Sequence, residues 1–268
     1  MNIQELFDLR GRVALVTGAY AWLGKDVASV LAEAGASVIV TSRSAEKAEE
    51  AALQLKQEYG NDTLGLTMNQ RQYASVQQMA EQAIAWKGKV DILVNNAGGG
   101  VGNSPGHLFK RSSEDIAAMI ETNLTGVIYC CKAVAPTMVE AGYGKIINIA
   151  SMAGLIGRDR RMYDRSGMNG QPVDYAAAKA GVIGLTRDLA GLLSPDGVYV
   201  NAISPGGFEK PGNLPEQFTG EFADATMLGR WGRMGLDLKG AALYLASPAS
   251  DNVTAHNLVV DGGFSLWK

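Results

Sequence analysis

The stretch RVALVTGAYAWLG, residues 12–24, joins an apolar run to a turn that two glycines bracket. The run 12–17 is apolar and β-branched, which predicts a strand buried on both faces. Residues 23–34 then show the spacing of a helix. A turn bounded by Gly18 and Gly24 lets backbone N–H groups approach a phosphate at the positive end of that helix. The stretch therefore predicts a strand–turn–helix unit that binds a nucleotide, with a purely structural turn as the alternative.

The same alternation of apolar runs and helical segments continues along the chain. Further strands are expected at 36–41, 63–68, 89–96, 144–151 and 198–204, and a last one in the run 256–263. Helices are expected at 44–59, 73–86, 113–141, 174–193 and 237–247. Strand–helix alternation implies parallel pairing with right-handed crossovers. The predicted fold is therefore α/β, a Rossmann-type doubly wound parallel sheet flanked by helices in a single domain over 1–268, with ligands at the carboxyl ends of the strands.

Two segments fit this alternation poorly. Residues 152–172 and 205–235 are expected as long loops at that end of the sheet. Loops of this length in a compact domain are usually functional. We interpret both as substrate loops, and the Gly, Pro and aromatic content of the second suggests a lid.

The composition excludes several classes of partner. A net charge of −3 and a pI near 5.5 argue against nucleic acid. No apolar run approaches the roughly 20 residues of a membrane span, and the first residues lack the apolar core of a signal peptide. Cys130 and Cys131 are adjacent, which is poor geometry for a disulfide, so we expect reduced packing residues and a cytoplasmic location.

Tyr175 and Lys179 form the clearest chemical pair. A spacing of four places both side chains on one helix face. An ammonium near a phenol stabilises the phenolate and lowers the tyrosine pKa, which would suit proton transfer to or from a carbonyl oxygen. One such pair can arise by chance, but Tyr175 is the only one of nine tyrosines with a lysine four residues on.

Three further positions carry polar groups toward the same region. Ser151 follows a predicted strand and can hydrogen-bond a carbonyl, or serve only the turn. Asn123 lies inside a predicted helix, where asparagine is mildly unfavourable, so it has either a function or simple solvent exposure. The sequence NNAG at 95–98 also follows a strand and also admits a turn-only interpretation.

The order of these features resembles the short-chain dehydrogenase/reductase family, in its shorter single-domain branch. The ordered set is the glycine loop, NNAG at 95–98, Asn123, Ser151, Tyr175 with Lys179, and PGG at 205–207. No single motif is decisive, but the set lies on the expected elements from about residue 10 to the closing VVDGG.

The resemblance implies a catalytic role for four residues. Tyr175 would be the general acid/base, and Lys179 would lower its pKa and hold the nicotinamide ribose. Ser151 would orient and polarise the carbonyl, and Asn123 would support a water that links Lys179 to solvent. Hydride would pass directly between nicotinamide and substrate, with no metal required.

The resemblance also implies the cofactor contacts. Residues 95–98, and among them Asn96, Ala97 and Gly98, would shape the cofactor pocket, and Pro205 and Gly206 would flank the nicotinamide. In the glycine loop the contacts would come from Gly18, Ala21, Trp22, Leu23 and Gly24.

This loop departs from the family pattern. In the spacing Thr-Gly-x-x-x-Gly-x-Gly, Trp22 occupies the middle glycine. In the longer-chain spacing Thr-Gly-x-x-Gly-x-x-Gly, Ala21 occupies it, and Trp22 would turn away from the pyrophosphate. We interpret the loop as modified but working, because a chain without cofactor would have no use for the complete catalytic set.

The end of the second predicted strand bears on the choice of cofactor. Sites for NAD place an acidic residue there, whereas this chain has Ser42 followed by Arg43. Arg43 can pair with a 2′-phosphate, so NADP(H) is preferred and NAD(H) stays possible. Asn69 stands where the family commonly has an aspartate against the adenine, and its amide oxygen can still accept a hydrogen bond.

The segment between Ser151 and Tyr175 is longer than usual in the family. It contains Arg158, Arg160, Arg161 and Arg165. One or more of them would contact an anionic or hydroxylated substrate, unless they form a solvated loop or a subunit contact. The region 172–208 is similar to gluconate-type and other polyol or sugar-acid dehydrogenases, and the altered loop is similar to that of enzymes in sialic-acid-like sugar pathways.

The expected function is therefore the NAD(P)(H)-dependent interconversion of a ketone and a secondary alcohol, on a sugar, sugar acid or polyol. One alternative is a 3-oxoacyl thioester reductase, and another is a non-catalytic dinucleotide-binding regulatory or scaffold protein. The resemblance also implies a homo-oligomer, a tetramer or dimer built through the long helices and the last strand.

Overall fold

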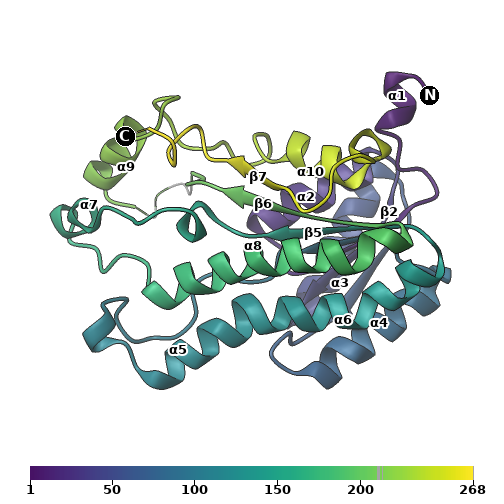
Figure 1. The fold of residues 1–268 in the computed structure, drawn as a ribbon, viewed down its shortest axis with the longest axis horizontal. Coiled ribbons are helices and arrows are strands. Elements are labelled where there is room, and N and C mark those ends of the chain that lie inside the picture. Colours follow the sequence, from purple (N-terminus) through teal and green to yellow (C-terminus); the bar gives the residue numbers. More distant parts are fainter. Residues whose placement is uncertain (210–211, 213, 268) are drawn as a thin grey trace.

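The computed structural model describes residues 1–209, 212 and 214–267. Its strands are β1 (Val13–Val16), β2 (Ser37–Ser42), β3 (Thr63–Thr67), β4 (Ile92–Asn95), β5 (Gly144–Ile149), β6 (Val198–Pro205) and β7 (Asn257–Val260). They pair in parallel in the order β3-β2-β1-β4-β5-β6-β7 (Figure 1). The order reverses between β1 and β4, so a crevice is expected at the carboxyl ends of these two strands. The predicted doubly wound parallel sheet is confirmed.

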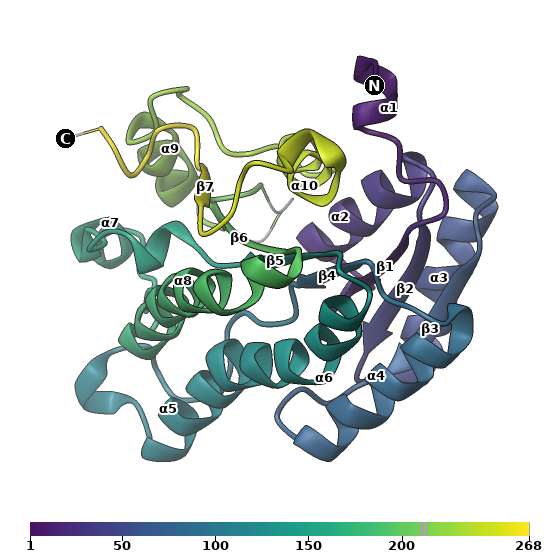
Figure 2. The same ribbon diagram turned by 45° about the vertical axis from the view of Figure 1, so that its right-hand side comes forward.

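Helices cover both faces of the sheet (Figure 2). One face carries α2 (Trp22–Glu33), α3 (Ala45–Tyr59) and α10 (Lys239–Ala246); the other carries α4 (Tyr73–Lys87), α6 (Gly126–Glu140) and α8 (Val173–Leu193). Shorter helices are α1 (Ile3–Leu6), α5 (Ser113–Ile120), α7 (Arg160–Arg165) and α9 (Glu216–Asp224). Single 3₁₀ turns lie at Leu108–Lys110, Met152–Gly154, Ser194–Asp196 and Pro248–Ser250.

The two layers of core follow from alternation along the strands. Ala14 and Val16 pack on the side of α2 and α10, whereas Val13 and Leu15 pack on the side of α4 and α6. All four side chains are at most 2% exposed, as expected for a strand buried on both faces. Cys130 and Cys131 are free and buried in the second layer, which confirms their interpretation as packing residues.

Two parts of the fold differ from the sequence-based expectation. The helix expected over 113–141 is divided into α5 and α6 by a π-helical turn, η2 (Glu121–Thr125). The segments expected as loops, 152–172 and 205–235, contain α7 and α9, which pack against each other. Residues 210, 211 and 213 of the second segment lie outside the described part of the chain. Within that described part, no helix has both the length and the apolar character needed to cross a membrane.

Candidate functional site

The turn after β1 is held tightly against the end of β4. The Asn96 side-chain amide donates to the carbonyl oxygen of Thr17 at 2.9 Å, and the Thr17 hydroxyl accepts from the backbone N–H groups of Asn96 and Ala97 at 3.0 Å. A Cβ on Gly24 would lie 2.3 Å from Asn96 Nδ2, and one on Gly18 would lie 2.9 Å from Ala97 Cα. Both glycines are therefore required by close approach. Asn96 and Ala97 thus brace this turn through Thr17, a residue that the sequence did not single out.

Trp22 adopts the backbone conformation of the glycine it replaces. Its φ of +54° lies in the left-handed region, whereas Ala21 is extended with φ −157°. The loop therefore follows the first spacing, with residue 22 in the glycine position, and not the second spacing, in which Ala21 would occupy it. The Trp22 side chain is 50% exposed, and Leu23 packs against the core. The left-handed region costs a non-glycine residue about 1–2 kcal/mol.

The amino end of α2 is suited to a phosphate. Its N-cap, Ala21, makes no side-chain hydrogen bond to the first-turn N–H groups. Uncapped N–H groups at the positive end of a twelve-residue helix favour an anion. Together with the close-packed Gly18 and Gly24, this end fits the pyrophosphate of a dinucleotide.

The ends of β2 and β3 carry the residues expected near the adenosine. Ser42 is buried and its hydroxyl accepts from the N–H of Ser44 at 3.2 Å, while Arg43 is exposed. Asn69 is partly buried, and its side-chain oxygen accepts from the N–H of Arg71 at 3.2 Å. The structure thus places an exposed cation and a partly buried amide at neighbouring strand ends, because β2 and β3 pair directly.

Ser151, Tyr175 and Lys179 come together beyond the end of β5. Ser151 caps the 3₁₀ turn Met152–Gly154, which packs on α8. A Cβ on Gly154 would lie 2.6 Å from the backbone nitrogen of Ala180, so this close packing requires glycine. It brings Ser151 within hydrogen-bond reach of Tyr175. The Lys179 Nζ lies 5.8 Å from the centre of the Tyr175 ring.

The electrostatics of this group differ from the expectation that Lys179 lowers the pKa of Tyr175. Burial raises the pKa of the Tyr175 phenol above 10, while the hydrogen bond with Ser151 and the charge of Arg158 act to lower it. Lys179 is 4% exposed and donates to the carbonyl oxygen of Ile149 at 2.7 Å. Burial lowers the pKa of Lys179 to about 8. Its ammonium is therefore engaged with a strand carbonyl, and the groups that act to lower the pKa of Tyr175 are Ser151 and Arg158.

Asn123 lies at the centre of the π-helical turn and is fully buried, so solvent exposure does not explain it. Its side-chain oxygen accepts from the N–H of Gly99 at 2.8 Å, and its amide donates to the Gly99 carbonyl at 3.0 Å. A Cβ on Gly98 would lie 2.6 Å from Asn123 Oδ1 and 3.6 Å from Lys179 Nζ. Asn123 Oδ1 and Lys179 Nζ thus both approach Gly98, and the π-helix is the local distortion that places the amide there.

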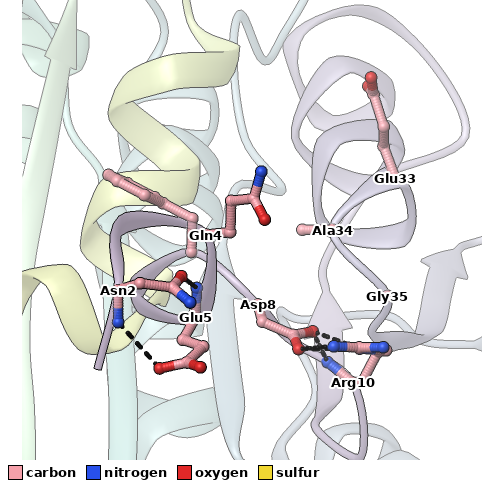
Figure 3. Close-up of a pocket in the computed structure, with 9 residues that line it drawn as sticks. Asn2, Gln4, Glu5, Asp8, Arg10, Glu33, Ala34 and Gly35 are labelled. Carbon is pink, nitrogen blue, oxygen red and sulfur yellow. Dashed lines mark hydrogen bonds and ion pairs between the residues drawn. The ribbon is translucent and has the colours of Figure 1, made fainter.

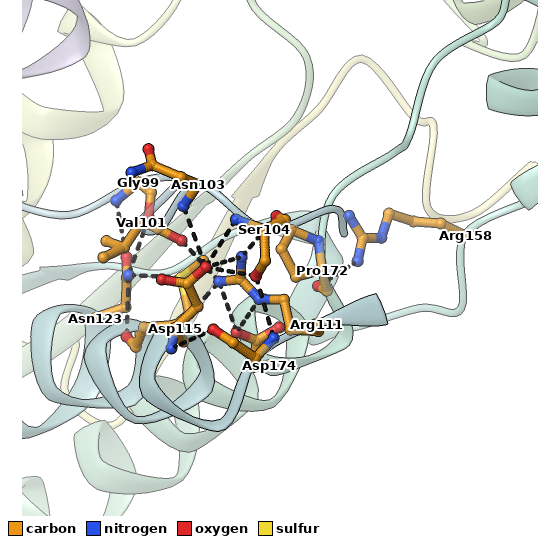
Figure 4. Close-up of polar contacts among 12 residues, drawn as sticks. Gly99, Val101, Asn103, Ser104, Arg111, Asp115, Asn123, Arg158, Pro172 and Asp174 are labelled. Atoms are coloured by element: carbon orange, nitrogen blue, oxygen red, sulfur yellow. Dashed lines mark hydrogen bonds and ion pairs between the residues drawn. The ribbon is translucent and has the colours of Figure 1, made fainter. Parts of the chain in front are cut away.

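A buried ion pair joins the loop after β4 to the helix that carries Tyr175 (Figure 4). Arg111 donates to Asp174 through Nε and Nη2, both at 3.0 Å, and the side chains are 1% and 3% exposed. Arg111 also donates to the carbonyl oxygen of Val101 at 2.7 Å. The sequence did not single out this pair, because its members lie 63 positions apart. Gln70 was also missed; its amide donates to the carbonyl oxygens of Ala97 and Thr122, at 3.0 and 2.5 Å.

The two expected substrate segments form one wall beside Ser151. An apolar cluster joins them: its buried members are Met152, Met162, Phe218 and Phe222, and Trp231 and Phe264 pack against these. Arg165 and Glu221 add an ion pair of 2.6 Å between α7 and α9. Pro205 ends β6, and the Gly206 N–H donates to the Val260 carbonyl at 2.9 Å. A Cβ on Gly207 would lie 2.4 Å from Phe222, so the glycines after β6 allow this wall to approach the strand end.

A hollow of about 500 Å³ lies at the other end of the sheet (Figure 3). Residues near the amino terminus and the turn Glu33–Gly35 line it, and among the lining residues Asp8 and Arg10 form an ion pair of 2.5 Å. The hollow precedes β1 and β2, so it faces away from the carboxyl ends where the site residues gather. It does not form part of the candidate site.

Comparison with known proteins agrees with this geometry. Residues 12–217 match the short chain dehydrogenase family. The 3-oxoacyl-[acyl-carrier-protein] reductase FabG of Vibrio cholerae is 36% identical, over 97% of this chain and 99% of its own length. The 2-dehydro-3-deoxy-D-gluconate 5-dehydrogenase of Formosa agariphila is 33% identical, over 97% and 94%. The crystal structure of a gluconate 5-dehydrogenase from Burkholderia cenocepacia, in complex with NADP and tartrate, superimposes with a TM-score of 0.88 at 33% identity, over 98% of this chain and 99% of that one.

Proposed function

From the premise that this chain belongs to the short-chain dehydrogenase family, as an NAD(P)-dependent oxidoreductase acting on CH–OH groups, we propose its reaction. It interconverts a ketone and a secondary alcohol on a sugar, sugar acid or polyol, with NADP(H) preferred. The observation that carries the reaction is the cluster of Ser151, Tyr175 and Lys179 beyond the end of β5. Family membership removes the non-catalytic scaffold as an alternative.

In this proposal Tyr175 moves the proton. In reduction its hydroxyl donates to the developing alkoxide oxygen, and in oxidation its oxygen accepts the alcohol proton. Ser151, already within hydrogen-bond reach of Tyr175, donates to the same substrate oxygen and fixes its position. The bound nicotinamide supplies or accepts the hydride.

Lys179 and Asn123 serve proton supply. The Lys179 ammonium, with its pKa lowered to about 8, can exchange a proton near neutral pH. Asn123 and Lys179 flank the space beside Gly98, where one water would connect the ammonium to solvent. Residues 18–24 and 96–98, with Pro205 and Gly206, would hold the cofactor.

The preference for NADP(H) rests on the end of β2. Arg43 is exposed there. The strand ends in Ser42 and not in an acidic residue, so no carboxylate at these two positions would repel a 2′-phosphate. Asn69, at the end of β3, would contact the adenine. We expect Arg43→Ala to weaken NADPH binding about tenfold, and to leave NADH binding unchanged.

The sugar-acid substrate is supported by the gluconate-type relatives and by the arginine-bearing segment 158–165. A 3-oxoacyl thioester is the second candidate, favoured by the 36% identity to the Vibrio reductase. An assay distinguishes the two candidates: a sugar-acid dehydrogenase would turn over D-gluconate, and a 3-oxoacyl thioester reductase would turn over acetoacetyl-CoA.

We also propose a cytoplasmic homo-oligomer. Apolar side chains are exposed on the outer strand and the last residues, at Val259, Leu266 and Trp267, and on the long helices at Ile128 and Leu192. Apolar groups on an edge strand favour pairing with a second copy.

The proposal is tested by titration with NADPH and NADH, followed by tryptophan fluorescence, and then by a substrate screen. We expect tighter binding of NADPH, and turnover of a sugar acid or polyol that Tyr175→Phe lowers at least about a hundredfold while cofactor binding persists. Tighter binding of NADH would overturn the role of Arg43. Folded protein that binds neither cofactor would overturn the proposed use of the site.

A further inference from the structure

The four arginines of the segment between Ser151 and Tyr175 have very different surroundings. Arg161 pairs with Asp159 at 2.9 Å and its side chain is 79% exposed. Arg165 pairs with Glu221 across the two substrate segments. Carboxylates already neutralise both of these cations, so neither is available to an anionic ligand.

Arg158 is held differently. Its Nη1 donates to the side-chain oxygen of Gln171 at 2.8 Å, and its Nη2 donates to the carbonyl oxygen of Pro172 at 3.0 Å. Both acceptors are neutral, and within the described residues no carboxylate lies within 4.0 Å of Arg158. The guanidinium is therefore oriented but not neutralised, and these bonds do not use all five of its N–H donors.

Burial and a neighbouring cation act against the positive charge of Arg158, whereas Tyr163 and Tyr175 act in its favour. Arg158 is partly buried, and both burial and the neighbouring Arg160 lower its pKa. Arg160 in turn donates to the Gln171 carbonyl at 2.6 Å, so both guanidinium groups bind the same two-residue segment, Gln171 and Pro172. A desolvated cation beside a second cation is stabilised when an anion binds between or against them.

The same guanidinium acts electrostatically on one of the proposed reacting groups, Tyr175. Its hydrogen-bond partner Pro172 precedes Tyr175 by three residues on the entry to α8. Figure 4 shows Arg158 directed toward Pro172, apart from the cluster around Arg111. A group bound to Arg158 would thus belong to the same small molecule that meets Ser151 and Tyr175.

We infer that Arg158, with Arg160 beside it, binds a carboxylate of the substrate and so selects sugar acids over neutral polyols. This inference rests on the proposed function, whose substrate class it narrows. A planar guanidinium with free N–H groups matches a carboxylate, which accepts two parallel hydrogen bonds. Arg158 determines specificity in this account, because it contacts a part of the substrate that is remote from the reacting atoms.

The test compares an acid with its neutral analogue on the full-length enzyme. With NADP⁺, kcat/KM is measured for D-gluconate and for D-glucitol in the wild type, Arg158→Met, Arg158→Lys and Arg161→Met. We expect the gluconate-to-glucitol ratio to fall about 10- to 100-fold in Arg158→Met and to recover in part in Arg158→Lys. Arg161→Met, the matched control, should leave the ratio within about twofold, since exposed pairs contribute little. An unchanged ratio in Arg158→Met would overturn the inference.

Binding separates this inference from the proposed function. Calorimetry in the presence of NADP⁺ measures the affinity of D-gluconate, L-tartrate and acetoacetate for the wild type and Arg158→Met. Suppose that the wild type turns over neither D-gluconate nor D-glucitol, but binds one of the carboxylates, and that Arg158→Met does not bind it. The proposed substrate class is then wrong, and the role of Arg158 stands. If the wild type binds none of the three, the role of Arg158 is wrong. Loss of acetoacetyl-CoA turnover in Arg158→Met, with carboxylate binding unchanged, would assign the guanidinium to a phosphate and overturn the carboxylate.

Discussion

Trp22 raises the sharpest question at the scale of single residues. It keeps the left-handed backbone of a glycine, with φ of +54°, and carries an indole that is half exposed at the start of α2. Strained residues of this kind persist where the surroundings fix them, and they gather at ligand sites. Trp22 therefore keeps a backbone conformation typical of glycine, and what differs from the family pattern is the side chain at this position of the turn.

The contribution of the Trp22 side chain to cofactor binding can be measured by placing glycine at this position. We expect Trp22→Gly to keep the Kd for NADPH within about threefold, because the turn already has the required conformation. Gly24→Ala should weaken NADPH binding at least about tenfold, since its Cβ would lie 2.3 Å from Asn96 Nδ2 and displace the amide that braces Thr17. Calorimetric titration of both variants checks the prediction. Equal losses in the two variants would show that the indole itself makes an important cofactor contact.

Lys179 gives a pH prediction at the same scale. Burial lowers its pKa from 10.5 to about 8, so in the folded protein the ammonium is present below pH 8 and is lost above it. Unfolded chains hold that proton up to about pH 10.4, so this group makes the folded state more stable as pH rises from 8 toward that value. In the proposed mechanism the ammonium supplies the proton, so the rate of reduction should fall as pH rises through about 8.

The titration can be followed directly. In protein labelled with ¹³C-lysine, one ε-carbon resonance should titrate near pH 8 and disappear in Lys179→Met. Lys87, whose amine pairs with Asp62 at 2.7 Å on the surface, supplies a reference resonance in the same spectrum. A Lys179 resonance that shifts only near pH 10 would contradict the burial argument.

At this scale the sequence predicted which residues gather beyond β5, but not the contacts that they make. Ser151, Tyr175 and Lys179 were found from their spacing and from their places at a strand end and on one helix face. The sequence could not show that Lys179 bonds to the Ile149 carbonyl, nor that Tyr175 is stabilised by Ser151 and Arg158. Those contacts depend on how α8 packs on the turn after β5, which is a tertiary property.

At the scale of elements, the pair of Arg111 and Asp174 fixes the entry to α8. Both side chains are almost fully buried, and Asp174 Oδ1 has no hydrogen-bond partner in the described part of the chain. Arg111→Met would leave this carboxylate buried without its cation. We expect the free energy of unfolding to fall by about 3–5 kcal/mol.

Urea denaturation measures this loss, and two variants control it. Arg10→Met removes an ion pair whose arginine side chain is 82% exposed, and it should leave the free energy of unfolding almost unchanged. The double variant Arg111→Met with Asp174→Asn should recover part of the loss, because no unpaired charge remains buried. A single-variant loss below about 1 kcal/mol would mean that the ion pair does not hold the loop to α8.

Element boundaries show where the sequence pattern stops being informative. The apolar spacing over 113–141 is helical throughout, so it could not reveal the π-helical turn that carries Asn123. The turn is stabilised by hydrogen bonds to Gly99, which lies 24 positions away. In the same way α9 was expected as part of a loop, and its aromatic residues Phe218 and Phe222 pack with Met162 of α7 and not on the sheet.

At the scale of the whole molecule, the sheet was predictable because the apolar runs that form its strands alternate with helices, and those of the central strands β1, β4 and β5 are buried on both faces. The oligomeric state was not predictable in the same way, because exposed apolar residues on one chain do not determine how many subunits associate. Val259 lies on the outer strand β7 and is 37% exposed, and Leu192 lies near the end of α8 and is 67% exposed. These positions are on different elements, so each can serve a separate contact.

Sedimentation of the purified protein distinguishes the possible assemblies. We expect the wild type at the mass of a dimer or tetramer of the 28.3 kDa chain. If it is a tetramer with two kinds of contact, Val259→Lys and Leu192→Glu should each give dimers and together give monomers, because a charge placed in an apolar interface opposes association. If it is a dimer, only one of the two should act. Leu53→Lys, at a residue 54% exposed on α3, is the control and should change nothing. A wild type that sediments as a monomer at micromolar concentration would contradict the proposed oligomer, and a wild-type oligomer that neither substitution disturbs would place its interface elsewhere.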